Sequence, residues 1–174
     1  MTRILGIDPG SRVTGYAVID EKPSGPMYVA SGCVRVGTDT FPGRLKQIYD
    51  GIHEVVRLYA PEQLAIEAVF MHRNADSALK LGQARGAAIC AALAEGLPVY
   101  EYAAREVKQA LVGKGGADKG QVQHMVKILL GLRGDIQADA GDALGVALCH
   151  LHHQQTERRL SGARRAVSRG GAAQ

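Results

Sequence analysis

Four carboxylates in this 174-residue chain each lie inside or beside an apolar stretch. Asp8 ends the apolar run RILGID and precedes a Pro-Gly turn, and Glu67 interrupts the apolar run QLAIEAV. Asp139 and Asp142 are three residues apart, so both lie on one face of a helix. Brought together, four acids would repel one another and raise each other's pKa values. A hard divalent cation such as Mg²⁺ or Mn²⁺, which prefers oxygen ligands, would resolve that repulsion.

Each acid also has a purely structural explanation. An Asp before Pro-Gly is ordinary turn chemistry, which would account for Asp8. Acids in the first turn of a helix complement its dipole, which would account for Asp139 and Asp142. The combination of these three with Glu67, an ionisable group inside an apolar strand, favours a shared site instead.

The strand that ends at Asp8 predicts how this acid is placed. Side chains alternate between the faces of a strand, so Asp8 points the same way as Ile4 and Gly6. Because Gly6 has no side chain, we expect open space beside Asp8. A carboxylate in that position is poorly solvated unless a positive charge joins it.

The hydrophobic pattern predicts three strands in succession, then alternating helices and strands, and a closing helix. Short links between the first three strands indicate an antiparallel meander. The next strand follows a helix and should run parallel to a neighbour, which brings Glu67 and Asp8 to one edge of the sheet. The fold class is therefore α/β with a mixed sheet. The expected strands are 4–8, 15–19, 27–36, 63–69 and 97–102, and the expected helices are 40–60, 75–95, 103–111, 121–130 and 138–153.

The composition is that of an ordinary globular protein, with 46% apolar and 22% charged residues. The length suits a single domain with its own core. No segment is long enough to span a membrane and the N-terminus has no signal-peptide pattern, so we expect a cytoplasmic protein. The cysteines Cys33, Cys90 and Cys149 lie in apolar stretches without metal-ligand spacing, and we expect them to be reduced core residues.

The net charge of +4 is unevenly distributed. Residues 154–174 hold five arginines and one acid, so this segment accounts for the whole excess. Residues 71–133 hold nine Lys or Arg and five acids, whereas 134–153 hold three acids and no Lys or Arg. A phosphate backbone carried to a metal site would require such a basic surface beside acids, although a solvated basic face is also common. The glycine-rich link 113–120, which carries two lysines, is expected to be mobile.

The helix expected at 75–95 is rich in Ala and Gly. Small residues permit close approach of another backbone. We therefore expect this helix to be buried on most sides, in part by a partner subunit, which makes it the candidate dimer interface.

Three histidines, His150, His152 and His153, are dense enough to suggest metal ligands. They lie at the far end of the last predicted helix, beyond its acids. A role as helix-end cations is favoured by that position.

Four long stretches carry a resemblance to a known family: GIDPGSRVTGYAVID (6–20), IEAVFMHRNADSALKLGQARG (66–86), EYAAREVKQALVGKGGADKGQVQHMV (101–126) and QADAGDALGVALCH (137–150). They closely resemble the RuvC family of bacterial Holliday-junction resolvases. The resemblance implies a ribonuclease H-like fold with a mixed five-stranded sheet, a homodimer, and cooperation with the RuvA–RuvB branch-migration complex. It also implies Mg²⁺-dependent symmetric nicking of four-way DNA junctions in recombination and repair, which leaves 5′-phosphate and 3′-hydroxyl ends.

The resemblance also implies roles for individual residues. Phe70 resembles the family's aromatic residue that stacks on unpaired bases, and Lys108 and Lys119 match basic positions that contact DNA near the scissile phosphate. A core aromatic and a solvated loop lysine are the structural alternatives for Phe70 and Lys119. The nuclease domain is expected to span 1–157, followed by a basic flexible tail, 158–174. The implied ligands of two Mg²⁺ ions, for which Mn²⁺ would substitute, are Asp8, Glu67, Asp139 and Asp142, and the path of the duplex arms is expected to involve Arg73, Lys80, Arg85, Arg105 and Lys114.

Two other functions compete with this interpretation. The sequence Gly-Ile-Asp-Pro-Gly-Ser also resembles the first phosphate hairpin of actin-like ATPases and sugar kinases, but this chain has neither their second hairpin nor their second domain. The other alternative is a junction-binding module that has lost activity. The intact acids Asp8, Glu67 and Asp139 argue against it, and metal-dependent turnover would separate the two.

Overall fold

The computed structural model describes residues 1–37, 40–69 and 74–170, with side chains as far as Gly162. Five strands form one sheet in the order β3-β2-β1-β4-β5. The first three strands are antiparallel, and β4 and β5 run parallel to β1, which confirms the predicted mixed sheet. The strands are β1 (Arg3–Asp8), β2 (Val13–Lys22), β3 (Gly25–Arg35), β4 (Gln63–Ala68) and β5 (Val99–Ala103).

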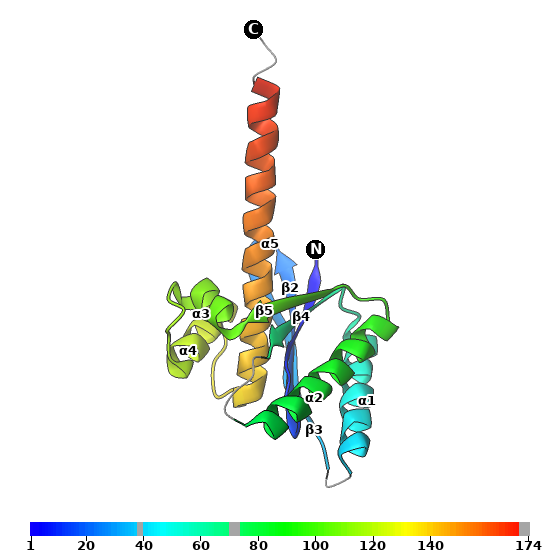
Figure 1. Ribbon diagram of the computed structural model, residues 1–174. Coiled ribbons are helices and arrows are strands. Elements are labelled where there is room, and N and C mark those ends of the chain that lie inside the picture. Colours follow the sequence, from blue (N-terminus) through cyan, green and yellow to red (C-terminus); the bar gives the residue numbers. More distant parts are fainter. Residues whose placement is uncertain (38–39, 70–73, 171–174) are drawn as a thin grey trace.

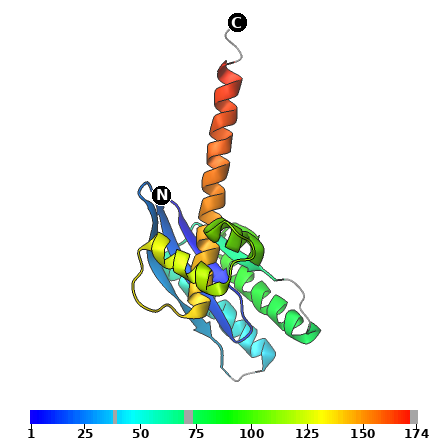
Figure 2. The same ribbon diagram turned by 90° about the vertical axis from the view of Figure 1, so that its left-hand side faces the viewer.

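Helices cover both faces of the sheet in a ribonuclease H-like arrangement (Figures 1 and 2). One layer is formed by α1 and α2, which pack on the same sheet face. The other layer contains α3, α4 and the first half of α5. The helices are α1 (Phe41–Tyr59), α2 (Ala75–Ala94), α3 (Ala104–Val112), α4 (Lys119–Leu130) and α5 (Ala138–Gly170).

The two cores follow from the alternation of side chains along β1. Leu5 and Ile7 are fully buried against the α1 and α2 layer, whereas Ile4 is buried against α5. Asp8 has the same parity as Ile4, so it lies on the α5 face of the sheet as predicted. The closing helix packs its acid-bearing face inward, since Ala143 and Val146 are fully buried.

The expected open space beside Gly6 is wrong, because α5 fills it. A Cβ at Gly6 would lie 2.2 Å from the carbonyl oxygen of Ala143. A Cβ at Gly15 would lie 2.0 Å from the carbonyl oxygen of Asp139. Both glycines therefore serve close approach: they let the backbone of α5 rest directly on β1 and β2, which fixes the start of α5 at the edge of the sheet.

The end of the last helix was predicted wrongly. Instead of stopping near His153, α5 continues to Gly170 and extends beyond the sheet (Figures 1 and 2). A single glycine such as Gly162 weakens a helix by only about 1 kcal/mol and does not end it. Arg158 also ties the extension to β2, because its Nη1 donates to Oε1 of Glu21 at 2.7 Å. The predicted boundary of the nuclease domain near residue 157 remains a prediction.

Two further expectations need correction. Lys119 is the first residue of α4 and does not lie in a loop, because Asp118 caps this helix by accepting a hydrogen bond from the backbone of Gln121. Cys90 is exposed and Cys33 is half-buried, so only Cys149 is the core cysteine that the sequence predicts. The apolar neighbours of Cys90 are small alanines of α2, which pack inward and leave the thiol on the outer side of the helix.

Candidate active site

Two of the four acids lie at the same edge of the sheet. Asp8 is the last residue of β1, and Glu67 is the second-last residue of β4. The parallel register pairs Ile7 with Ile66, so each acid comes one residue after a paired position. Both side chains have the parity that faces α5. The predicted convergence of Asp8 and Glu67 is therefore observed.

The other two acids come from the first turns of α5. Asp139 is the second residue of this helix, and Asp142 lies one turn further along. The contact between Gly15 and the backbone of Asp139 holds this turn against β2, immediately beside the end of β1. All four acids are partly buried. They thus come from three different elements and meet at one edge of the sheet.

The charges of the four acids oppose one another. The pKa of Asp8 is raised to about 7, first by burial and then by the negative charges of Glu67, Asp142 and Asp139. The pKa of Glu67 is also raised, by burial first and by Asp142 second. A carboxyl group whose pKa is raised by burial and by neighbouring charges marks a candidate functional site.

Two lysines, one on α3 and one on α4, neutralise part of the negative charge of the four acids. Nζ of Lys119 pairs with Oδ2 of Asp142 at 2.6 Å, and this contact raises the pKa of the lysine. The positive charges of Lys108 and Lys119 also offset part of the rise in the pKa of Glu67. A cavity of about 210 Å³ lies between these groups, lined by Glu67, Ala104, Val107, Lys108, Lys119, Val122 and Asp142.

The donor set fits a hard divalent cation. All four acids offer only carboxylate oxygens, the ligands that Mg²⁺ and Mn²⁺ prefer, and Lys119 is the single cation in direct contact with an acid of the set among the residues described. Within residues 1–37, 40–69 and 74–162, no three His, Cys, Asp or Glu side chains are arranged closely enough to form a complete metal site.

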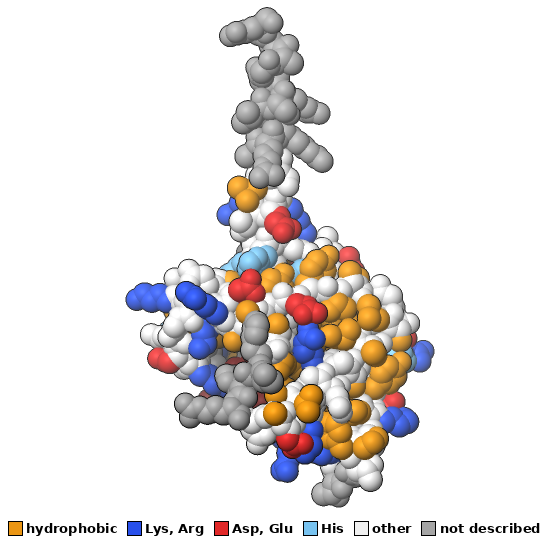
Figure 3. Space-filling model, in the orientation of Figure 1, with side chains coloured by type: hydrophobic (Ala, Val, Ile, Leu, Met, Phe, Trp, Pro, Cys, Tyr) orange, Lys and Arg blue, Asp and Glu red, His pale blue; other side chains and the backbone are white. Residues whose placement is uncertain are grey.

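The residues predicted to contact DNA are placed unevenly. Phe70 and Arg73 lie outside the described residues. Lys108 is half-buried beside Glu67, and Lys114 is exposed on the link between α3 and α4. The blue side chains that gather over α3 and α4 in Figure 3 belong to this side of the molecule. Arg105, on α3, is exposed there as well.

Two other predicted DNA contacts have protein partners instead. Lys80 pairs with Asp76 one helical turn away on α2. Arg85 pairs with Glu101, and its side chain is only 17% exposed, so its place on the path of the duplex arms stays a prediction. Because Lys80 and Arg85 are paired with acids, the number of Lys and Arg in residues 71–133 is larger than the number of unpaired positive charges there.

The α2 helix is less buried than its composition predicts. Ala84 and Ala88 are fully buried, but Leu79 is 66% and Leu93 is 54% exposed. Hydrophobic side chains accordingly gather over α2 on the face shown in Figure 3. Within one protomer α2 keeps an exposed apolar side, and its burial by a partner subunit stays a prediction.

Sequence analysis missed the role of His150. This residue is fully buried between Tyr102 and Gln63, with Tyr102 Oη 2.7 Å from Nδ1 and Gln63 Oε1 2.9 Å from Nε2. Because α5 continues past it, His150 is not a helix-end cation, and that prediction is wrong. Its partners are 48 and 87 residues away in the chain, so no local pattern could have revealed them.

The sequence of residues 4–150 matches the family described as crossover junction endodeoxyribonuclease RuvC. The chain belongs to the RuvC family. A crossover junction endodeoxyribonuclease RuvC of Methylococcus capsulatus is 66% identical over 161 residues, which cover 92% of this chain and 97% of that relative. A second, from Dichelobacter nodosus, is 63% identical over 154 residues, which cover 88% of each chain.

Solved structures agree with this assignment. The structure of T. thermophilus RuvC in complex with a Holliday junction substrate superposes with a TM-score of 0.84 at 32% identity, and it covers 90% of this chain and 97% of that one. Membership of the RuvC family makes the chain a nuclease and sets aside the actin-like ATPase alternative. In the part of the chain that the structure describes, no helix has the length and apolarity needed to cross a bilayer.

Proposed function

We propose that this protein resolves four-way DNA junctions by paired, Mg²⁺-dependent nicks, with Asp8, Glu67, Asp139 and Asp142 as metal ligands. The observation that carries the proposal is the meeting of four carboxylates at one edge of the sheet, where burial first and then the charges of the other three acids raise the pKa of Asp8. Divalent cations supply the positive charge that this edge lacks. Two ions per site would suit four carboxylates, and Mn²⁺ would substitute for Mg²⁺ because it prefers the same oxygen ligands.

The acids and lysines divide the chemistry between them. Asp8, Glu67, Asp139 and Asp142 would hold Mg²⁺, which would supply Lewis-acid activation of water and charge stabilisation for a hydrolysis that leaves a 5′-phosphate and a 3′-hydroxyl. The chain's own part is to hold the carboxylates ionised and correctly placed. Asp8 must lose its proton before it can act as a ligand, and the raised pKa makes this the most pH-sensitive step.

The two lysines near the acids bind the scissile phosphate in this proposal. Lys119 is 60% exposed and its Nζ pairs with Oδ2 of Asp142. Metal binding to Asp142 would free the ammonium group of Lys119 to stabilise negative charge that develops on the phosphate. Lys108 lines the same cavity as Glu67. Its proposed contact is with the DNA backbone next to the scissile phosphate. Lys114, Arg73 and Phe70 are proposed as DNA contacts on the strength of the family resemblance.

A homodimer is the second part of the proposal. Junction resolution requires two cuts on strands related by a two-fold axis, and an isologous dimer supplies two such sites. The exposed Leu79 and Leu93 lie on α2 together with Gly82 and Gly86, beside which a Cβ would meet no atom within 4 Å. This apolar, small-residue side of α2 suits a second copy of the chain. We also propose the RuvA–RuvB complex as a partner, on the strength of the family resemblance, and the cytoplasm as the location.

The proposal is tested by cleavage of a synthetic four-way junction, with a linear duplex of the same sequence as the control. Wild type and Asp8→Asn are compared in Mg²⁺ and in EDTA. We expect paired nicks in opposing strands that require Mg²⁺, disappear in Asp8→Asn and spare the duplex. Tight junction binding without cleavage across sequences and metals would instead favour the inactive binding module.

A further inference from the structure

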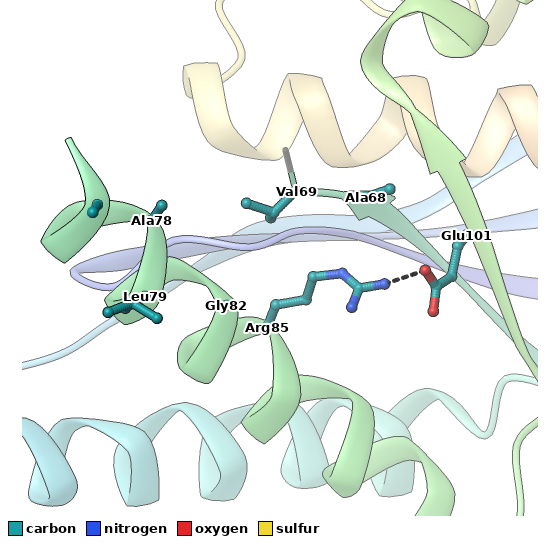
Figure 4. A pocket seen from close by; sticks show the side chains of 8 residues that line it. Ala68, Val69, Ala78, Leu79, Gly82, Arg85 and Glu101 are labelled. Carbon is teal, nitrogen blue, oxygen red and sulfur yellow. Dashed lines mark ion pairs between the residues drawn. The ribbon is translucent and has the colours of Figure 1, made fainter. Parts of the chain in front are cut away.

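Arg85 connects α2 to the strand that carries Glu67. Its Nε donates a hydrogen bond to the backbone carbonyl oxygen of Glu67 at 3.1 Å. Its Nη2 lies 2.6 Å from Oε2 of Glu101 on β5. Figure 4 shows the side chain extending from α2 past the end of β4 toward Glu101. One guanidinium thus holds two neighbouring strands at the position of a proposed metal ligand.

The backbone at Glu67 has limited support from the sheet. Pairing between β1 and β4 ends at Ile66, so at Glu67 only β5 still pairs with β4. The strand itself ends one residue later, at Ala68. Arg85 therefore supplies a further contact to the backbone of Glu67 at the point where only one neighbouring strand still pairs with β4.

The arginine acts from the opposite side of the sheet to the acids. Glu67 faces the α5 layer, whereas Arg85 reaches the strand from α2 in the other layer. The charges that shift the pKa of Glu67 are those of Asp142, Lys108 and Lys119. The charge of Arg85 is paired with Glu101. Its influence on Glu67 is therefore through the position of the backbone and not through its charge.

The surroundings of Arg85 favour a fixed side chain. It lines one side of an apolar groove of about 530 Å³, together with Ala78, Leu79 and Gly82 of α2 (Figure 4). Nη2 is buried, and within the described residues its contact with Glu101 is an ion pair that lacks hydrogen-bond geometry. A buried charge of this kind is costly to leave without its partner, so Arg85 and Glu101 constrain each other.

We propose that Arg85 is a positioning residue for Glu67, which it places for metal binding by tying the end of β4 to β5 through the Glu67 carbonyl and the Glu101 carboxylate. The inference rests on the proposed function, since it concerns the placement of one proposed metal ligand. Groups that orient metal ligands from outside the site typically change metal affinity or activity by about 10- to 100-fold when removed.

The test compares Arg85→Ala and Arg85→Lys with wild type and with Arg57→Ala, an exposed arginine of α1, as the matched control. Single-turnover cleavage at saturating junction gives the half-saturating Mg²⁺ concentration. Electron paramagnetic resonance gives the Mn²⁺ dissociation constant without turnover. We expect both constants to rise about tenfold in Arg85→Ala. Arg85→Lys should be intermediate, because one ammonium group cannot hold both partners in the geometry of a guanidinium. Arg57→Ala should match wild type.

Two controls separate positioning from other effects. Junction affinity in EDTA and the mass of the protein by sedimentation should be the same in Arg85→Ala and wild type. A normal metal response in Arg85→Ala would overturn the inference, as would a defect that appears only as lost dimer or lost junction affinity. If wild type neither cuts junctions nor binds Mn²⁺, the proposed function fails and takes the inference with it. If wild type does both and the variants match it, only the inference fails.

A second variant keeps the test open if Arg85→Ala does not fold. Glu101→Gln leaves the bond to the Glu67 carbonyl in place and removes only the ion pair. Because Glu101 is partly exposed, a rise of about two- to fivefold in the half-saturating Mg²⁺ concentration is expected. An unchanged Mg²⁺ response in Glu101→Gln would then overturn the inference.

Discussion

Two regions along α5 both bury ionisable groups, but one brings like charges together and the other satisfies a buried ring with hydrogen bonds. The carboxylate end, formed by Asp8, Glu67, Asp139 and Asp142, collects like charges and raises the pKa of Asp8 to about 7. The histidine end is formed by His150, by its hydrogen-bond partners Tyr102 and Gln63, and by Gln154, which donates to Gln63; both ring nitrogens of His150 are hydrogen-bonded. The two regions lie two to three helical turns apart along α5 and at opposite ends of β4.

The geometry of the histidine end fixes its protonation. Oε1 of Gln63 can only accept, so Nε2 of His150 donates to it, and Nδ1 then accepts from the hydroxyl of Tyr102. Burial lowers the pKa of His150 to about 4, with smaller contributions from His153 and Arg158. A buried polar group that is fully hydrogen-bonded serves the fold, whereas buried acids without sufficient counter-charge indicate a binding site.

Substitution at the carboxylate end should produce the largest effect on activity and no loss of stability. We expect Glu67→Gln and Asp139→Asn each to reduce junction cleavage by at least about 100-fold, because each removes a metal ligand. Their free energies of unfolding in EDTA should equal or exceed that of wild type, because the like-charge repulsion is relieved. Cleavage rates and urea denaturation measure the two effects, with Glu54→Gln, an exposed acid of α1, as the control. A strongly destabilised Glu67→Gln would erase the distinction between the two ends.

Substitution at the histidine end should show the reverse. His150→Leu leaves the buried hydroxyl of Tyr102 without its hydrogen bond and removes one of the two hydrogen bonds that Oε1 of Gln63 accepts, so we expect the free energy of unfolding to fall by about 1–3 kcal/mol. Cleavage measured well below the melting temperature should stay close to that of wild type. If this variant lost activity while fully folded, His150 would belong to the catalytic machinery.

Lys119 lies on the boundary of the carboxylate end and should have an intermediate effect. We expect Lys119→Ala to lower the cleavage rate by about 10- to 100-fold through lost charge stabilisation at the phosphate. Stability should change little, since the pair with Asp142 is partly exposed. Lys119→Arg, with Lys127→Ala on the same helix as the control, shows whether a compact ammonium group is needed. A Lys119→Ala variant with the wild-type rate would confine this lysine to a structural role.

The smallest effect concerns pH, where the two ends should have opposite signs. Asp8 has a raised folded pKa, so its contribution to stability in EDTA is present below about pH 4 and is lost as the pH rises through about 7. His150 has a lowered folded pKa, so its contribution is present above about pH 6.5 and is lost as the pH falls toward 4. Free energies of unfolding from urea denaturation should change by on the order of 1–2 kcal/mol across this range, a value reduced for solvent screening because Asp8 is only partly buried. Asp8→Asn should flatten the alkaline side and His150→Leu the acidic side, and a variant that flattens the wrong side would contradict the assignment.

The sequence predicted the carboxylate end better than the histidine end, for a physical reason. Strand endings, helical spacing and parallel register are local properties, and together they placed Asp8, Glu67, Asp139 and Asp142 at one edge. Long-range pairings have no such local signature. Arg85 bonds across 18 residues to Glu67, and His150 bonds across 87 residues to Gln63, so composition alone suggested different roles for both.

Glycine was interpreted wrongly where its role was long-range. Gly6 was expected to leave space, whereas it is the point at which α5 contacts β1. The length of α5 was also missed, because the first glycine pair after His153 is Gly170–Gly171 and an ion pair to Glu21 supports the extension of the helix. Alternation along a strand therefore predicted which face Asp8 occupies, but only tertiary packing decides what fills that face.

The central claim is that the carboxylate end is incomplete without a divalent cation. The melting temperatures of wild type and Asp8→Asn at about pH 8, each in EDTA and in saturating Mg²⁺, test this claim most directly. We predict that Asp8→Asn is the more stable protein in EDTA, and that Mg²⁺ raises the melting temperature of wild type but not that of Asp8→Asn. Equal responses of both proteins to Mg²⁺, or a wild type that is already the more stable protein in EDTA, would contradict it.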